Sequence, residues 1–107
     1  MNMKHFAVTR EKGPGWDPSQ PLRKQKMWTE HAAFMNQLAE EGFVIFGGPV
    51  GDQAKLGFSK AIFLVYAESE NIIETRLKAD PWTKLGLLRT KIEPWEILQG
   101  KGKLAHA

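Results

Sequence analysis

The chain has 107 residues, no cysteine and a formal net charge of +3. This length predicts a single domain over residues 1–107, and the lack of cysteine excludes disulfides and thiolate metal sites. No apolar stretch approaches the ~20 residues that span a membrane, and the start MNMKHFAVTR is typical of a strand rather than of a signal segment. The basic stretch LRKQK is interpreted as a solvated helix edge. We therefore expect a cytoplasmic protein that binds neither membranes nor nucleic acid.

The first element is predicted to be a strand that leads into a long loop. In residues 4–10, Phe6 and Val8 alternate with Ala7 and Thr9, which is the period-two pattern of a strand. The following EKGPGWDPSQP holds three prolines and two glycines, so residues 11–23 are predicted to form a loop. A loop of this length in a small domain often has a functional role.

Residues 24–41 are predicted to form the main helix, which Gly42 ends. At 100° per residue, one apolar stripe collects five side chains: Met27, His31, Phe34, Met35 and Leu38. A histidine in such a stripe has two interpretations. It can be a buried neutral residue bonded to a nearby polar group, or it can serve as a general acid–base, because an imidazole exchanges protons near neutral pH.

The rest of the chain completes a recognisable element order. Apolar runs at residues 43–46 and 61–66 flank a glycine-rich connection and predict a hairpin. Ser69 is a predicted cap for a helix over residues 70–79, and a last strand places Leu88, Thr90 and Ile92 on one face. The order predicts an α+β, ferredoxin-like βαββαβ fold: an antiparallel four-stranded sheet with two helices on one face.

The apolar strand runs indicate that both faces of this sheet become buried, so we predict a homodimer. The core is expected over about residues 4–98, and residues 99–107 are expected to form a flexible tail.

Asp80 stands where the second helix is expected to end, before Pro81 and Trp82. An Asp-Pro pair is a common helix-start signal, so Asp80 can be simply a cap. It can also be a site residue, since a histidine paired with an aspartate is held in one tautomer and becomes a stronger base. His31 and Asp80 are therefore the two candidate catalytic residues.

The remaining candidates would bind a substrate. Arg10 could bind a carboxylate through two parallel hydrogen bonds, or be a solvated strand end. Trp16, Trp28 and Trp82 could form an apolar wall, or anchor the loop and core. Gly48 and Pro49 could line a cleft, but "GGPVG" is more typical of a hairpin connection than of an anion-binding loop. His5 and His106 show no metal-ligand spacing, so we expect neither a metal nor another cofactor.

Two segments, WTEHAAFMNQLAEEGFVIFGGP and LKADPWTKLGLLRTKIEPW, resemble the YCII-related family over residues 4–98. The resemblance implies a dimeric α/β barrel with an acid–base pair at His31 and Asp80. It also implies a superfamily of isomerases, lyases and monooxygenases that act on small, often aromatic-derived, acids or lactones. Members often carry an arginine where this chain has Trp28, and the GPGWDPSQP insertion is longer than in the family. Either Arg10, Arg23 or Lys24 replaces that arginine, or the substrate differs.

The leading functional hypothesis is a cofactor-independent lyase or isomerase in which His31 and Asp80 move a proton on a small organic acid or lactone. The alternative is a non-catalytic binding or sensor module that uses the same cleft for a small, anionic ligand. A monooxygenase is a third hypothesis.

Overall fold

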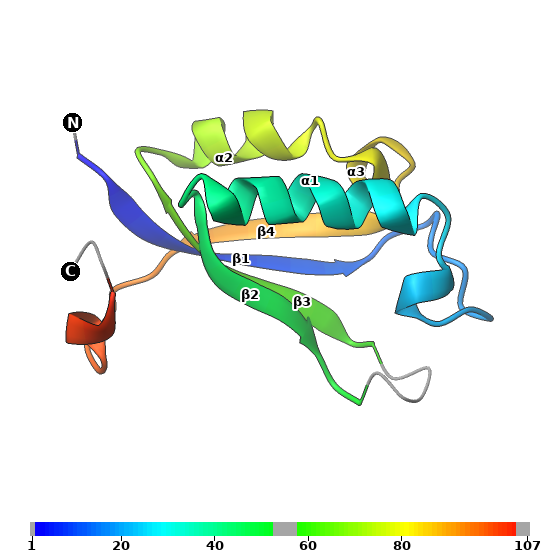
Figure 1. Ribbon diagram of the computed structural model, residues 1–107, viewed down its shortest axis with the longest axis horizontal. Helices are drawn as coiled ribbons and strands as arrows, with labels where there is room; N and C mark the ends of the chain where they lie inside the picture. The colour runs from blue at the N-terminus through cyan, green and yellow to red at the C-terminus, as the bar shows by residue number, and fades with distance from the viewer. Residues whose placement is uncertain (1, 53–57, 105–107) are drawn as a thin grey trace.

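The structure, a computed structural model, describes residues 2–52 and 58–104. Figure 1 shows an antiparallel four-stranded sheet with the helices on one of its faces. The strand order across the sheet is β2-β3-β1-β4, so the predicted ferredoxin-like α+β fold is confirmed. The elements in chain order are β1 (Lys4–Lys12), η1 (Leu22–Lys24), α1 (Trp28–Glu40), β2 (Val44–Val50), β3 (Lys60–Ala67), α2 (Glu70–Leu77), α3 (Pro81–Lys84), β4 (Leu88–Pro94) and η2 (Lys101–Lys103).

The main helix begins later than its sequence predicts. Its expected start at residue 24 is wrong, because Met27 has a left-handed backbone (φ 62°) and residues 22–24 form a separate 3₁₀ turn. Met27 is therefore outside the apolar stripe, with 40% of its surface exposed. His31 and Leu38 are buried as the pattern predicts.

The loop before α1 is held by one buried side chain. The amide of Gln25 accepts a hydrogen bond from the backbone N–H of Asp17 (3.0 Å) and donates to the carbonyls of Asp17 (2.8 Å) and Gln20 (2.9 Å). Farther back, the N–H groups of Gly13 and Gly15 donate to the carbonyls of residues 87 and 86. The loop is thus fixed against the start of β4.

Strand β2 continues beyond the point where a turn is expected. It runs through Gly47 and Pro49 to Val50, paired with β3, and the tip of the connection at residues 53–57 lies outside the described residues. A proline is tolerated because β2 is an edge strand. Gly47 permits a close approach of β2 to β3. A Cβ atom at this position would overlap the ring of Phe63 and lie 2.6 Å from the carbonyl oxygen of residue 62.

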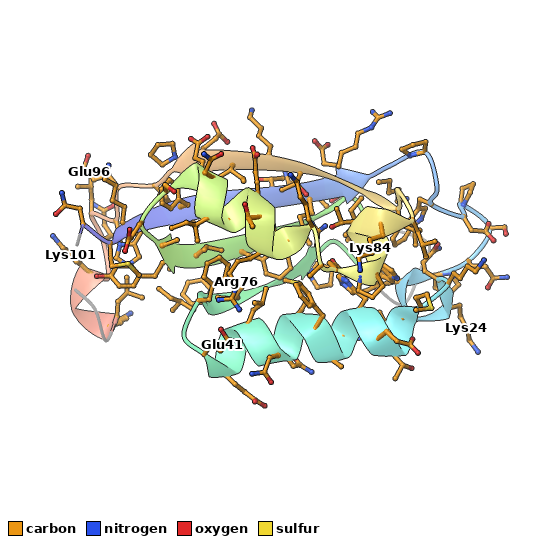
Figure 2. The ribbon with its side chains drawn as sticks, turned by 90° about the horizontal axis from the view of Figure 1, so that it is seen from above. Lys24, Glu41, Arg76, Lys84, Glu96 and Lys101 are labelled. Atoms are coloured by element: carbon orange, nitrogen blue, oxygen red, sulfur yellow. The ribbon has the colours of Figure 1, made fainter. Side chains whose placement is uncertain are left out.

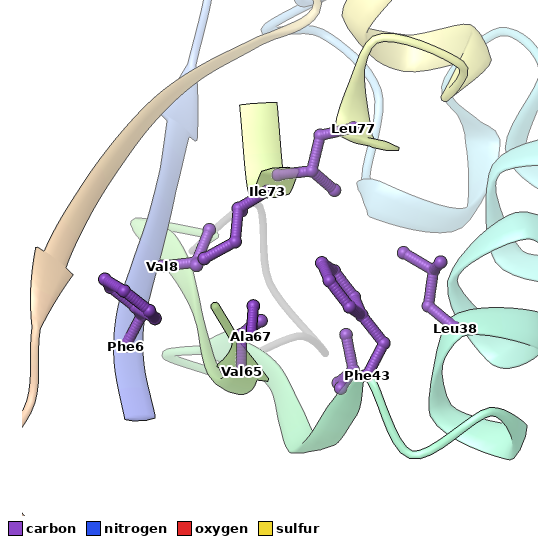
Figure 3. Packing of buried hydrophobic residues seen from close by; sticks show 9 residues of the cluster. Phe6, Val8, Leu38, Phe43, Val65, Ala67, Ile73 and Leu77 are labelled. Atoms are coloured by element: carbon purple, nitrogen blue, oxygen red, sulfur yellow. The ribbon is translucent and has the colours of Figure 1, made fainter. Parts of the chain in front are cut away.

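The main core lies between the sheet and the two longer helices (Figure 3). Ile73 of α2 is 0% exposed and Leu38 of α1 is 1% exposed, so each contributes on the order of 2–5 kcal/mol relative to alanine. The full cluster comprises Phe6, Val8, Leu38, Phe43, Val44, Val65, Ala67, Ile73 and Leu77.

Seen from above the sheet, α1 and α2 run side by side and are joined by an ion pair between Glu41 and Arg76 (2.7 Å; Figure 2). Each side chain of this pair is 37% exposed, and an exposed ion pair contributes little to stability because solvent screens it. The core, not this ion pair, therefore holds the helices on the sheet.

The opposite face of the sheet carries apolar side chains. Phe46 is 59% exposed, and the chain after β4 folds against one end of this face, with a groove lined by residues that include Leu64, Trp95 and Leu98. The homodimer through this face stays a prediction. Of the expected flexible tail, residues 101–103 form a short 3₁₀ turn, and residues 105–107 lie outside the described residues. In the described ranges, no helix is long and apolar enough to cross a membrane.

Candidate active site

Asp80 lies at the junction between two helices, where the backbone fixes its carboxylate. Helix α2 ends at Leu77, and Pro81 takes the first position of α3. Oδ1 of Asp80 accepts a hydrogen bond from the backbone N–H of Trp82 (3.0 Å), so the helix-cap interpretation is correct. The side chain is 0% exposed. This cap hydrogen bond uses only one of the lone pairs of the carboxylate, so the others can accept hydrogen bonds from further donors.

His31 of α1 meets this carboxylate. Its Nδ1 atom lies 2.9 Å from Oδ1 and 3.0 Å from Oδ2 of Asp80. An ionised carboxylate can only accept, so Nδ1 carries a proton, and in the neutral imidazole the lone pair is then on Nε2. Among the described residues, no hydrogen bond is made by Nε2. The structure therefore brings together the two residues predicted as an acid–base pair, and the contact favours the neutral tautomer with its lone pair on Nε2.

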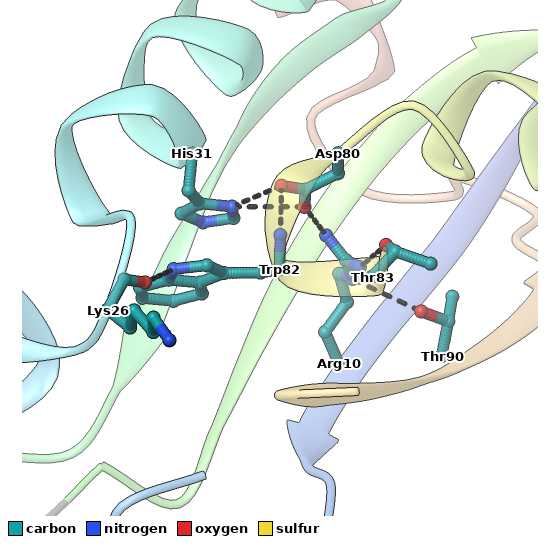
Figure 4. A network of polar contacts seen from close by, with 7 residues as sticks. All are labelled: Arg10, Lys26, His31, Asp80, Trp82, Thr83 and Thr90. Atoms are coloured by element: carbon teal, nitrogen blue, oxygen red, sulfur yellow. Dashed lines mark hydrogen bonds and ion pairs between the residues drawn. The ribbon is translucent and has the colours of Figure 1, made fainter. Parts of the chain in front are cut away.

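Arg10 is the second partner of Asp80 (Figure 4). From the end of β1, its three guanidinium nitrogens donate to Oδ2 of Asp80 (2.6 Å), to the Thr83 hydroxyl (2.6 Å) and to the Thr90 hydroxyl (3.1 Å). The Arg10 side chain is 0% exposed. Sequence reasoning proposed Arg10 as a ligand for a substrate carboxylate, whereas this geometry makes it the buried counter-ion of Asp80. The two threonines were not foreseen, because only the fold brings residues 83 and 90 to residue 10.

The charges of this cluster compensate one another. One guanidinium and one carboxylate cancel, which removes most of the cost of burying either charge alone. Burial by itself raises the pKa of Asp80 and is the largest single influence. The hydrogen bond and charge of His31, together with those of Arg10, outweigh it, so the pKa of Asp80 lies below its ordinary value. Asp80 is therefore an ionised hydrogen-bond acceptor at neutral pH.

This lowered pKa predicts a pH dependence of stability. A carboxyl whose pKa is lower in the folded state stabilises the fold above its unfolded pKa, about 3.9, and this contribution is lost as the pH falls through the folded-state pKa. We expect the gap in unfolding free energy between the wild type and Asp80→Asn to be full at pH 7 and to shrink below about pH 4. Urea unfolding at several pH values measures it. Glu96→Gln, which changes an exposed carboxylate, is the control. A gap that stays constant down to pH 2.5 would contradict the assignment.

Three tryptophans surround the pair. The rings of His31 and Trp82 stack with centroids 3.8 Å apart and planes 4° apart, and Trp28 lies 5.7 Å from Trp82. Trp16 is also buried, stacked on Phe58 and edge-on to Trp82. The three tryptophans thus cluster beside the pair, with Trp16 farther from His31 than Trp82 is.

His31 and Trp82 border a cavity of about 410 Å³ between α1 and the sheet. This size is within the range of roughly 300–1,000 Å³ that is typical of small-molecule sites. Four of the predicted substrate-binding residues, Arg10, Trp28, Gly48 and Pro49, also line it, whereas Trp16 does not. Sequence reasoning missed most of the apolar lining: Leu22, Ala32, Met35, Ala39, Val44, Phe46, Gly47, Phe58, Ala61, Phe63 and Leu88, with Asn36 as an additional polar residue.

Within residues 2–52 and 58–104, no group of three or more His, Asp or Glu side chains is arranged to hold a metal ion. His106 lies outside the described residues.

Comparison with known proteins identifies a structural relative. No protein-family model and no curated protein matches the chain. A solved structure that matches is 5-chloro-2-hydroxyhydroquinone dehydrochlorinase from Burkholderia phenoliruptrix AC1100 in complex with 2,5-dihydroxybenzoquinone. The match has a TM-score of 0.67 and 24% sequence identity, and covers 89% of this chain and 96% of the dehydrochlorinase. At this identity, the likeness establishes a shared fold.

Proposed function

We propose that the protein is a small-molecule enzyme of the lyase or isomerase type, in which His31 is the general acid–base and Asp80 orients it. One observation carries the proposal. The Asp80 carboxylate holds Nδ1 of His31 at 2.9 Å, and this histidine lines an aromatic cavity of about 410 Å³. A base held in one tautomer beside an apolar cavity is suited to removing a proton from a bound ring.

The proposed reaction begins when Nε2 of His31 takes a proton from a hydroxyl group, or from a C–H group beside a carbonyl. The imidazolium that forms keeps its Nδ1–H bond to Asp80, whose negative charge stabilises it. In an elimination, the electrons of the broken bond form a double bond and the leaving group departs with its own pair. In an isomerisation, His31 returns the proton to another carbon.

The proposed substrate is a hydroxylated ring. The aromatic lining from Trp28, Phe58 and Phe63 favours a flat apolar body. Because Arg10 is engaged by three protein acceptors, a weakly acidic hydroxyl fits the cavity better than a carboxylate does. The dehydrochlorinase that shares the fold is named for a chlorinated hydroxyhydroquinone, which supports this substrate class. Membership in the YCII-related family and dimerisation through the open sheet face are parts of the same proposal.

The test is a substrate panel: 5-chloro-2-hydroxyhydroquinone, other halogenated hydroquinones, and small lactones. Chloride release and changes in the ultraviolet spectrum report turnover, and calorimetry with 2,5-dihydroxybenzoquinone reports binding. Turnover by the wild type that is lost in a folded His31→Gln variant supports the enzyme. Binding of 2,5-dihydroxybenzoquinone without turnover of any panel member favours the alternative, a binding or sensor module with the same cavity.

A further inference from the structure

Trp82 contacts both members of the acid–base pair. Its backbone N–H donates to Oδ1 of Asp80 (3.0 Å), and its indole ring lies flat on the His31 imidazole, with 3.8 Å between the centroids. The remaining described neighbours of His31 include Trp28, whose ring is tilted by 47° and lies 6.0 Å away. Trp82 is therefore the one stacked aromatic partner of this imidazole among the described residues.

The two contacts constrain different motions of the imidazole. The carboxylate of Asp80 fixes the direction of Nδ1, but a hydrogen bond leaves the ring able to tilt about that direction. A ring stacked within 4° of parallel opposes such a tilt. Because the lone pair of Nε2 does not lie along the axis of this hydrogen bond, a tilt of the ring about that axis changes the direction in which the lone pair points. The stacking contact with Trp82 therefore limits the directions in which Nε2 of His31 can point.

The indole is itself held in place. Its Nε1–H donates to the carbonyl of Lys26 (2.6 Å), just before the left-handed turn at Met27 that opens α1. The backbone N–H of His31 in turn donates to the carbonyl of Met27 (2.9 Å), the residue that follows Lys26. Trp82 is 1% exposed and meets Trp16 edge-on. Two hydrogen bonds thus join the start of α3 to the start of α1: one from the Trp82 indole to Lys26, and one between His31 and Asp80.

We propose that Trp82 is a positioning residue, which sets the plane of the His31 ring and so the direction of Nε2. The consequence for turnover rests on the proposed function, whereas the consequence for the His31 ring does not. Sequence reasoning placed Trp82 in the substrate-binding wall. Its ring stacks on the histidine, so Trp82 has a second role beside its place in the cavity lining.

The test combines two substitutions with nuclear magnetic resonance. Trp82→Phe keeps a ring that can stack but loses the Nε1–H donor, and Trp82→Leu removes the ring. In the wild type, the ring current of the indole should shift the carbon-bound ring protons of His31 upfield of those of free histidine. We expect Trp82→Phe to keep an upfield shift and Trp82→Leu to lose it. Trp16→Leu is the matched control, since it removes another buried tryptophan of the same cluster and should leave the His31 shifts in place.

Turnover gives the second readout. In Trp82→Leu we expect kcat to fall about 10–100-fold with KM changed less than about threefold, because the base is misplaced rather than removed. Trp82→Phe should restore most of kcat. Thermal melting checks that each variant is folded. Unshifted His31 ring protons in the wild type overturn the proposal even if neither variant folds. Shifts that persist in a folded Trp82→Leu also overturn it. Since these shifts need no turnover, a wild type that turns over no substrate counts against the proposed function alone.

Discussion

Replacement of His31 by glutamine is expected to lower kcat by about 10²–10⁴-fold, the usual contribution of a general acid–base. The glutamine amide can still form a hydrogen bond with Asp80, but it cannot take and return a proton at neutral pH. The loss should therefore fall on kcat, with KM and thermal stability changed little. Steady-state kinetics on the best substrate of the panel measure it.

The control for this substitution is His5→Gln. His5 lies on β1, on the face of the sheet opposite to Phe6 and Val8 and away from the cavity lining. His31→Ala provides a further test, because imidazole added from solution can occupy the space beside Asp80 and restore part of the rate. A His31→Gln variant that keeps its rate within about threefold of the wild type would exclude His31 as the acid–base, since this is far below the general acid–base contribution.

Substitution of Arg10 by methionine is expected to destabilise the fold by about 3–5 kcal/mol at neutral pH, because it leaves the Asp80 carboxylate buried without its counter-ion. This is a large part of the 5–15 kcal/mol that is typical of whole domains. The stability of Arg10→Lys should lie between that of the wild type and that of Arg10→Met. An ammonium keeps the charge but lacks the planar fork that reaches Asp80, Thr83 and Thr90 together. Urea unfolding at pH 7 measures all three proteins.

Arg76→Met is the matched control, because it removes the exposed ion pair with Glu41 and should destabilise the fold far less than Arg10→Met does. The double variant Arg10→Met, Asp80→Asn should be more stable than the sum of the single losses predicts, since the unpaired charge is gone. Equal losses of unfolding free energy in Arg10→Met and Arg76→Met would show that the buried ion pair stabilises the fold no more than the exposed one does.

The fold was accessible from the sequence where local patterns decide structure. The alternation around Phe6 and Val8, the glycine at 42 and the cap at Ser69 each specify a local conformation, and their order predicts the topology. The errors occurred where tertiary contacts override local pattern. The amphipathic stripe continues back to Met27, but Gln25 binds the loop backbone instead of a helix. Pairing with β3 likewise extends β2 through its glycines.

The site was predicted in part. His31 and Asp80 follow from a histidine on an apolar stripe, an Asp-Pro helix start, and the family resemblance. The roles of Arg10 and Trp82 could not be predicted, because each depends on contacts between residues more than 50 positions apart. The pattern shows that Arg10 ends a strand but not that Asp80 lies 2.6 Å from it. It shows an aromatic residue after Asp-Pro but not that its ring stacks on His31.

A crystal structure with 2,5-dihydroxybenzoquinone tests the central claim most directly, because it locates a ring of the proposed class relative to the proposed base. The account predicts a ring oxygen within about 2.6–3.2 Å of Nε2 of His31, the reach of a proton transfer. The Nδ1 contact with Asp80 should remain near its present 2.9 Å. A ligand bound outside the cavity, or inside it with no polar atom near Nε2, would contradict the assignment of His31 as the acid–base.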